Sequence, residues 1–357
     1  MIIPLTISVI VISVVFCFNY LPLYFRRNWR RKGMAFTFLI SAYLVVASVL
    51  APMGSDRERY LADFRYAEHL PFIKDPGWVL LTKLLNKVCM GDEMLYLFVL
   101  VIFYVFAYCY LGRCKLGRQH VAYYLLLSAA CLGFWSGSTN IMRAGCATCL
   151  FFLSLCEEEH RKWAYIALSV VCVFIHNSVL ILVASFFLTR YYRNYKAFVL
   201  LWLVFLALSA ANALGPIVSF LSSHTGEVGD RIAEYAYGDD ESSNALYRHA
   251  GFRMDFIVYS SLAVIYSWWI IYKKHYRDAF FQRISCTYII VNCMWLTMIR
   301  VNYADRFALL SWSLISLIIL YPYMNPVRRL PFSSKVVTVA FIPMLVNLAI
   351  TLRDLFS

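Results

Sequence analysis

Apolar runs long enough to cross a lipid bilayer recur along this chain, separated by short charged loops. Hydrophobic residues make up 62% of the sequence and charged residues 15%, against about 25% charged residues in soluble domains. Because a span needs about 20 residues, the chain has room for about 11–12 transmembrane or re-entrant helices. We predict an all-α, polytopic integral membrane protein in which residues 1–357 form a single membrane domain. The expected segments are 2–25, 33–51, 93–111, 121–136, 139–156, 163–175, 177–189, 197–221, 254–272, 284–299, 307–321 and 336–353.

The basic loops predict the side of the membrane on which each connection lies. Short loops rich in Lys and Arg generally stay in the cytoplasm. The net charge of +13 lies mostly in such loops, so it sets topology and does not indicate nucleic-acid binding. This rule places the N-terminus and the loops 52–92 and 222–253 outside. The basic loops are 26–32, 113–118, 190–196, 273–283 and 328–335.

The two outer loops differ in character. In the loop 52–92, a break at Pro76–Gly77 precedes apolar residues at helical spacing, with Lys83 and Lys87 on the other face. That pattern predicts an amphipathic helix lying on the membrane surface. The loop 222–253 is rich in Gly, Ser and acidic residues. It is either a flap over a site or a plain solvated connector.

The apolar run 163–189 has His176 at its middle. As a single span it would place the basic loop 190–196 outside, whereas a split at Ile175–His176 keeps every basic loop inside. Each half would have about 13 residues and measure about 20 Å, too short for an upright span. We therefore favour a hairpin with His176 at its outer tip over one tilted helix. A histidine on an apolar face is more often a core residue, but at an outer tip it suits proton transfer.

Arg143 lies within the apolar run 139–156. A charge at membrane depth costs about 3 kcal/mol on insertion scales, so such residues usually face a cavity, a partner or a ligand. Asn140 lies three residues earlier, on the same face of the expected helix. The planar guanidinium suits a phosphate or a carboxylate. The alternatives are snorkelling to the interface and pairing with an acidic residue elsewhere.

Two more groups of polar residues stand at the expected outer ends of spans. Asp56, followed by Tyr60, would act as a base or orient a sugar hydroxyl, or would simply cap a helix. Arg300 and Arg306 flank an outer turn. Two arginines there would suit a pyrophosphate, and pairing with other loop charges is the alternative.

Sequence patterns for several other chemistries are missing. The chain has no P-loop, no glycine-rich dinucleotide pattern and no zinc-protease motif. No acidic pair stands in a metal-binding context, and most of the 11 cysteines lie in apolar runs as small hydrophobic residues. We expect neither a metal nor a cofactor. Matched Gly/Pro-broken helices are also missing, which weakens a secondary-transporter reading.

Four motifs carry a family resemblance. They are Gly54-Ser55-Asp56 with Tyr60, then Asp75-Pro76-Gly77-Trp78, then Asn140 with Arg143, and finally Phe174, His176, Ser178 and Leu180. In these motifs and their order, the chain resembles the EpsG family of bacterial exopolysaccharide proteins, which are similar to Wzy-type polysaccharide polymerases. The resemblance covers most of residues 50–190, with a weaker echo at Arg306. Asp75 stands where the family usually has Glu, and Ala144 where it usually has Gln.

The resemblance implies a membrane glycosyltransferase at the outer face of a bacterial inner (cytoplasmic) membrane. It would transfer a glycan from undecaprenyl pyrophosphate to a sugar hydroxyl of another lipid-linked repeat unit, building exopolysaccharide, capsule or O-antigen. Arginines would stabilise the departing pyrophosphate. A histidine or carboxylate would deprotonate or orient the acceptor hydroxyl, and aromatic rings would stack on sugars or anchor at the interface. The implied catalytic residues are His176, Asp56 and Arg143, and the implied substrate-binding residues are Tyr60, Asp75, Trp78, Asn140, Arg300 and Arg306.

The same resemblance implies binding partners, and it leaves several alternative functions open. The expected partners are the undecaprenyl-pyrophosphate-linked oligosaccharide, membrane lipid, a chain-length regulator and a flippase. A glycan ligase would use the same charges for a different acceptor. A flippase or transporter for lipid-linked oligosaccharide needs a charged path through the bundle, and a structural assembly partner needs no site. The choice between His176 and Asp56 as the base stays open.

Overall fold

A computed structural model describes residues 29–51, 54–72, 75–213, 252–300, 304–331 and 342–349, which form helices, turns and no β-strand. The protein is all-α and polytopic, as predicted. Three helical segments among the described residues are long and apolar enough to cross a membrane, namely Glu93–Leu116, Met254–Lys273 and Arg306–Met324. Four shorter apolar helices join them, namely Met34–Val49, Lys162–Ile175, Val179–Tyr191 and Tyr195–Ala210.

Several sequence expectations fall on other parts of the chain. The segment 2–25, the loop 222–253 except its last two residues, and most of the segment 336–353 lie outside the described residues. The total number of spans therefore stays a prediction. The chain divides into two compact units, one of residues Met1–Val183 with Ser313–Ser357 and the other of Ala184–Trp312. One membrane domain can contain two such units, so the single domain also stays a prediction.

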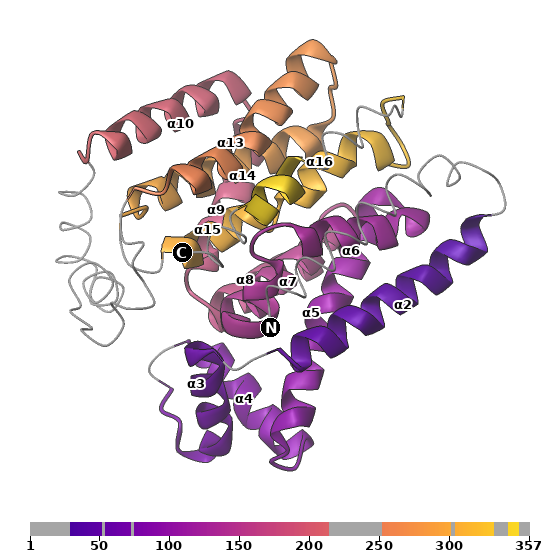
Figure 1. The fold of residues 1–357 in the computed structure, drawn as a ribbon, viewed down its shortest axis with the longest axis vertical. Helices are drawn as coiled ribbons and strands as arrows, with labels where there is room; N and C mark the ends of the chain where they lie inside the picture. Colours follow the sequence, from indigo (N-terminus) through magenta and orange to yellow (C-terminus); the bar gives the residue numbers. More distant parts are fainter. Residues whose placement is uncertain are drawn as a thin grey trace. The chain divides into compact units, whose positions relative to one another are not determined.

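The first unit is built around α7, Met142–Glu157, which packs against α5, Glu93–Leu116, and α8, Lys162–Ile175 (Figure 1). Most side chains of α7 are buried, because it has neighbours on several sides. Helices α2, Trp29–Val49, and α6, Val121–Ala130, also contact α5. The other elements of this unit are the turns η1 (Ala67–His69), η2 (Arg118–His120) and η3 (Ser136–Asn140), the helix α16 (Ile315–Met324) and the start of α9 (Val179–Tyr191).

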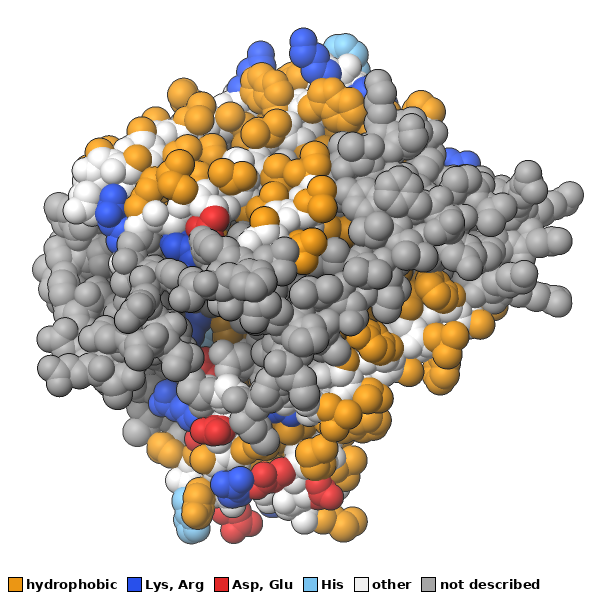
Figure 2. Space-filling view, in the orientation of Figure 1, with side chains coloured by type: hydrophobic (Ala, Val, Ile, Leu, Met, Phe, Trp, Pro, Cys, Tyr) orange, Lys and Arg blue, Asp and Glu red, His pale blue; other side chains and the backbone are white. Residues whose placement is uncertain are grey.

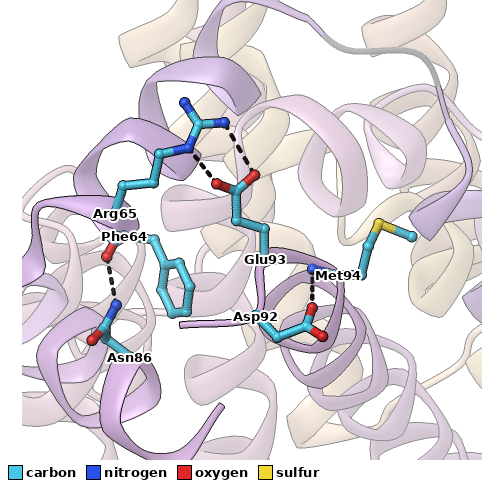
Figure 3. Close-up of polar contacts among 6 residues, drawn as sticks. All are labelled: Phe64, Arg65, Asn86, Asp92, Glu93 and Met94. Atoms are coloured by element: carbon cyan, nitrogen blue, oxygen red, sulfur yellow. Dashed lines mark hydrogen bonds and ion pairs between the residues drawn. The ribbon is translucent and has the colours of Figure 1, made fainter. Parts of the chain in front are cut away.

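Much of the expected outer loop 52–92 folds into two helices, α3 (Ser55–Arg65) and α4 (Pro76–Val88). Helix α3 is a structure that the sequence pattern did not predict. Figure 3 shows how the end of α3 is fixed to its neighbours. Asn86 of α4 donates to the backbone oxygen of Phe64 at 2.7 Å, and Arg65 forms an ion pair with Glu93 at the start of α5. These contacts attach α3 to both α4 and α5.

The prediction of an amphipathic helix at 78–88 is confirmed by α4. One side of α4, including Trp78 and Leu85, is buried against the unit. Another side exposes Leu80, Leu84 and Val88, which lie four residues apart on one stripe. An exposed apolar stripe of this kind suits contact with lipid, and the position of α4 on the membrane surface stays a prediction.

The chain is broken at His176, as the charge of the loops predicted. Helix α8 ends at Ile175 and α9 begins at Val179, so the run 163–189 is two short helices and not one. The re-entrant direction of the second helix stays a prediction. The expected segment 307–321 is also interrupted, because a turn at 313–314 separates α15, Ala304–Trp312, from α16.

The second unit contains α10 (Tyr195–Ala210), α13 (Met254–Trp268), the π-helical turn η4 (Trp269–Lys273), α14 (Ala279–Thr297) and α15. Its buried polar side chains pair across helices. Trp202 donates to the side-chain oxygen of Asn292 at 2.8 Å, and Trp312 donates to the Ser260 hydroxyl at 2.7 Å. Apolar side chains cover the outside of its helices (Figure 2). Polar pairs inside and apolar residues outside suit a helix bundle in lipid.

Arg57 is a buried cation that the sequence reading missed. Its guanidinium donates to the backbone oxygens of Ser48, Val49 and Ala51 at 3.2, 2.5 and 3.0 Å. These carbonyls belong to the last turn of α2 and the residues after it, where helices lack intrahelical donors. Arg57 therefore caps α2 from α3 and fixes the angle between the two helices.

We predict that Arg57→Ala lowers the stability of the folded protein. The substitution leaves buried carbonyl oxygens without donors, at a cost of about 3 kcal/mol. The melting temperature in detergent should fall by several degrees, with a smaller fall for Arg57→Lys. Arg59→Ala is the matched control, because Arg59 is exposed on the same helix. Equal melting temperatures for the two alanine variants would contradict the capping role.

Candidate functional site

The side chain of Asp75 is completely buried at the start of α4. The residue is the N-cap of that helix and has φ 48° and ψ 66°, in the left-handed region. Among residues with a side chain, Asp and Asn adopt this conformation most readily. A shorter carboxylate than the family's usual Glu therefore suits the backbone at this position.

Three donors from two other segments surround the Asp75 carboxylate. Nη1 of Arg143 lies 3.0 Å from Oδ2, and Nδ1 of His176 lies 3.4 Å from the same oxygen. The backbone N–H of Asn177 donates to Oδ1 at 3.3 Å. We call Asp75, Arg143, His176 and Asn177 the Asp75 cluster. It joins the second, third and fourth motifs of the resemblance in one place.

The pKa of Asp75 reflects a competition between burial and these donors. Burial acts to raise the pKa, but the hydrogen bond from His176 and the charge of Arg143 outweigh it and hold the pKa at about 2. The carboxylate is therefore ionised throughout the physiological range. It acts as a fixed negative charge that orients the cation and the imidazole beside it.

Two glycines allow the backbone to approach closely enough to form the cluster. A Cβ at Gly77 would lie 2.7 Å from the backbone carbonyl of Phe174, so α4 meets the end of α8 only without a side chain here. A Cβ at Gly54 would lie 2.5 Å from Oδ1 of Asn140. Gly54 thus lies against the Asn140 side chain, so the first motif contacts the third and all four motifs meet in the first unit.

Arg143 lies at the second residue of α7 and not several residues inside a helix. The expectation that Arg143 lies several residues inside the start of a span, on one helix face with Asn140, is therefore wrong. The π-helical turn η3 ends at Asn140, and Ile141 is the N-cap of α7. Of the alternatives, pairing with an acidic residue elsewhere is the one observed. The Nε of Arg143 and the Oδ1 of Asn140 are buried without a hydrogen bond, which leaves donor and acceptor capacity beside the cluster.

Asp63 is a second carboxylate near Arg143 that the sequence reading did not identify. Burial raises the pKa of Asp63, while the charges of Arg59 and Arg143 act to lower it. Arg143 thus influences two carboxylates that titrate differently, since Asp75 has a strongly lowered pKa. The sequence signal that could have identified Asp63 is its position seven residues after Asp56, which is about two helical turns along α3.

Tyr60 and Trp78 are both buried and pack edge to face, with ring centroids 5.4 Å apart. In this conformation the two rings join α3 to α4, and the expected stacking on sugars stays a prediction. Asp56 lies in the first turn of α3, where a negative charge is favourable. The N-cap of that helix is Gly54, without a side-chain capping bond.

Arg300 and Arg306 belong to the second unit. The guanidinium of Arg300 donates to the backbone oxygens of Ser209 and Ala210, the latter at 3.3 Å. Arg300 therefore caps the C-terminal end of α10, a role that the sequence did not predict. Arg306 is half-buried in the first turn of α15. The convergence of these arginines on a shared pyrophosphate site stays a prediction.

No cluster of three or more His, Cys, Asp or Glu side chains placed to hold a metal ion occurs in the described part of the chain. The expectation that the chemistry uses neither a metal nor a cofactor stays a prediction. The cluster itself offers one fixed anion, one cation and one imidazole. Such a set can bind an anion and exchange a proton.

The lowered pKa of Asp75 predicts a pH-dependent contribution to stability. A carboxylate with a lowered folded-state pKa stabilises the protein above its unfolded value near 4, by about 2 kcal/mol, and loses this as the pH falls towards 2. Asp75→Asn should lower the melting temperature in detergent at pH 7. The difference from the wild type should narrow as the pH falls from about 4 to about 2.

Asp92→Asn serves as the control for that titration, because Asp92 is an exposed N-cap of α5 and Asn caps equally well. A melting temperature for Asp75→Asn equal to that of the wild type at pH 7 would contradict the buried ion pair.

Comparison with known proteins agrees with the four motifs. No curated protein and no solved structure matches the chain significantly. The family model of the EpsG family matches residues 33–354, which is nearly the whole chain and includes both units. The motif residues Gly54, Asp75, Arg143 and His176 all lie within the matched range and meet in the structure. The chain is therefore a member of the EpsG family.

Proposed function

We propose that this protein polymerises undecaprenyl-pyrophosphate-linked oligosaccharide repeat units into exopolysaccharide, capsule or O-antigen. Family membership supports a polysaccharide polymerase. The observation that carries the proposal is the Asp75 cluster, which places a cation and an imidazole on one buried carboxylate. A lipid-pyrophosphate donor needs a cation for its leaving group and a base for the acceptor, and the cluster supplies both.

The reaction exchanges one bond at the anomeric carbon of the donor sugar. The bond from this carbon to the pyrophosphate oxygen breaks, and a bond to the acceptor hydroxyl oxygen forms. The acceptor's proton passes to a base, and undecaprenyl pyrophosphate leaves with the bonding electron pair as an anion. Negative charge therefore develops on the leaving group while positive charge appears on the base.

Arg143 is the residue that we assign to the leaving group. One nitrogen of its guanidinium pairs with Asp75, and its buried Nε makes no hydrogen bond. The remaining donors suit a pyrophosphate oxygen, because a guanidinium binds two acceptors in one plane. Asn140, with its unpaired buried Oδ1 beside the cluster, is assigned to the substrate hydroxyls. Arg300 and Arg306 belong to the second unit, and their assignment to substrate binding stays a prediction from the sequence.

His176 is the base that we favour over Asp56. Nδ1 of His176 faces the ionised Asp75 carboxylate, an arrangement that orients an imidazole so that Nε2 accepts a proton. Asp56 lies on α3, and Asp63 on the same helix offers a carboxylate whose pKa is raised by burial. These two carboxylates are the alternative candidates for the general base.

The proposed setting is the outer face of a bacterial inner membrane. In the first unit, the cluster forms where α7 begins and α8 ends, beyond the end of α2. The loop charges predict that these helix ends face outward. The exposed stripe of α4 would rest in the lipid that carries the substrate. A flippase that delivers repeat units and a chain-length regulator are the expected protein partners.

We predict that Arg143→Ala and His176→Ala each abolish chain extension while the protein remains folded and inserted. Loss of a general base typically lowers a rate by about 100-fold or more. Arg143→Lys should restore activity only in part, because a lysine lacks the planar fork. The measurement is a gel of lipid-linked and surface polysaccharide from a deletion strain complemented with each variant.

Matched controls come from the connection between α7 and α8. Arg161→Ala and His160→Ala remove the same residue types from exposed positions and should leave chain length unchanged. Single repeat units accumulating outside the membrane in the Arg143→Ala strain would establish a polymerase. Units held on the cytoplasmic side would indicate a flippase, and free polymer that is not transferred would indicate a ligase. Normal chain length in both cluster variants at normal protein levels would overturn the site.

The choice of base generates a separate prediction. Asp56→Asn and Asp63→Asn should each retain measurable chain extension, whereas His176→Gln should not, because only His176 is held by Asp75. Initial rates of chain extension in membranes, measured across pH, distinguish the three. A loss of the rising acid limb of the pH profile in Asp63→Asn, with the limb intact in His176→Gln, would assign the base to Asp63 instead.

A further inference from the structure

Four helix ends lie together at one end of the second unit. Helix α9 ends at Tyr191 and α10 begins at Tyr195, while η4 ends at Lys273 and α14 begins at Ala279. The helices pack against one another, with α14 contacting both α10 and α13. Lys, Arg and His side chains appear together at the top of Figure 2, where the orange helices of Figure 1 end. The loops 190–196 and 273–283 at this end are basic, so the charge rule predicts that this end faces the cytoplasm.

A cavity of about 450 Å³ lies between these helix ends. Ligand sites typically measure about 300–1,000 Å³. Arg193 and Arg277 line the cavity from two different loops, and His275 lines it from the same loop as Arg277. All three side chains are exposed, so they are accessible to a ligand from outside the protein. We call this cavity the arginine pocket.

The pocket has a surplus of positive charge. Asp278 is its acidic lining residue, and the Oδ1 of Asp278 accepts a hydrogen bond from the backbone N–H of Phe281 at 2.8 Å, as the N-cap of α14. Beside the pocket, the ammonium groups of Lys196 and Lys274 lie over the rings of Tyr272 and Trp269, at 5.3 and 5.0 Å from the ring centroids. The pocket lining therefore has two arginines and one carboxylate, which is already bonded to a helix end, and two lysines lie over aromatic rings nearby.

The aromatic residues indicate the depth of the pocket in the membrane. Tyr195 and Tyr272 line it, and Trp268 packs against Tyr272 with ring centroids 4.4 Å apart. Tyrosine and tryptophan are enriched at the level of lipid headgroups. Basic pockets between helix ends on the cytoplasmic side bind anionic headgroups. A soluble anion would need the charges but not the aromatic residues.

We propose that the arginine pocket binds the phosphate headgroup of an anionic phospholipid in the inner leaflet. Arg193 and Arg277 supply planar donor pairs for the phosphate oxygens, and His275 and Gln282 supply further polar contacts. The glycerol backbone lies against the half-buried Tyr272, and the acyl chains run along the apolar surface of α10 and α13. This occupant is distinct from the undecaprenyl-linked substrate proposed for the Asp75 cluster.

The test uses the full-length protein in a neutral detergent. Phosphatidylglycerol, phosphatidylcholine with the same acyl chains, or inorganic phosphate is titrated in, and the melting temperature is recorded. A ligand that binds only the folded state raises the melting temperature. We expect phosphatidylglycerol to raise it in a saturable manner and phosphatidylcholine to leave it unchanged. Arg193→Gln combined with Arg277→Gln should weaken the apparent affinity by at least about tenfold.

The matched control is Arg113→Gln combined with Arg118→Gln, which removes two exposed arginines from the same predicted side of the membrane. An equal loss of affinity in this control would overturn the proposal in favour of general charge attraction. Equal stabilisation by inorganic phosphate would overturn the lipid assignment in favour of a soluble phosphate compound. If the glutamine variant does not fold, Arg193→Lys with Arg277→Lys keeps the charge but removes the fork. An unchanged affinity of that lysine variant for phosphatidylglycerol would contradict the proposed bidentate contacts of the two arginines.

Discussion

The buried carboxylate of Asp75 is the constraint on which the first unit depends. A buried charge is stable only when donors surround it, and those of Asp75 come from the start of α7 and the residues after α8. The carboxylate is therefore satisfied only when α4, α7 and α8 meet in one arrangement. Apolar packing alone gives little preference between helix arrangements in lipid, because the lipid is as apolar as the side chains. A polar contact of this kind selects one arrangement from many.

The backbone around the cluster is shaped for the same contact. Gly77 removes the side chain that would separate α4 from the carbonyl of Phe174. Arg57 fixes α3 to the end of α2, and Asn86 fixes α4 to α3. Each of these contacts joins a helix terminus to a neighbour, where backbone groups lack intrahelical partners. The contacts at the helix ends therefore also position the residues of the site.

The sequence predicted the features that depend on hydrophobic pattern and charge. Apolar runs located most of the described helices, and the basic loop 190–196 predicted the break at His176. The motifs predicted that Asp75, Arg143 and His176 matter but not that they touch. The turn η3 was missed because a local π-helical turn has no hydrophobic signature, and it moves Arg143 to the start of α7. The roles of Arg57, Asp63 and Arg300 depend on which helix ends come together, which a one-dimensional pattern does not contain.

The charge balance of the cluster bears on how a polymerase could release its product. With a neutral imidazole, Arg143 and Asp75 sum to no net charge, since the pKa of Asp75 at about 2 keeps it ionised. An uncompensated arginine would hold the departing lipid pyrophosphate tightly and slow each cycle. In the proposed reaction His176 becomes positive when it accepts the acceptor's proton, as the leaving group becomes negative. The attraction is therefore stronger in the transition state than in the ground state, which is the differential binding that catalysis requires, and it weakens again when the proton leaves His176.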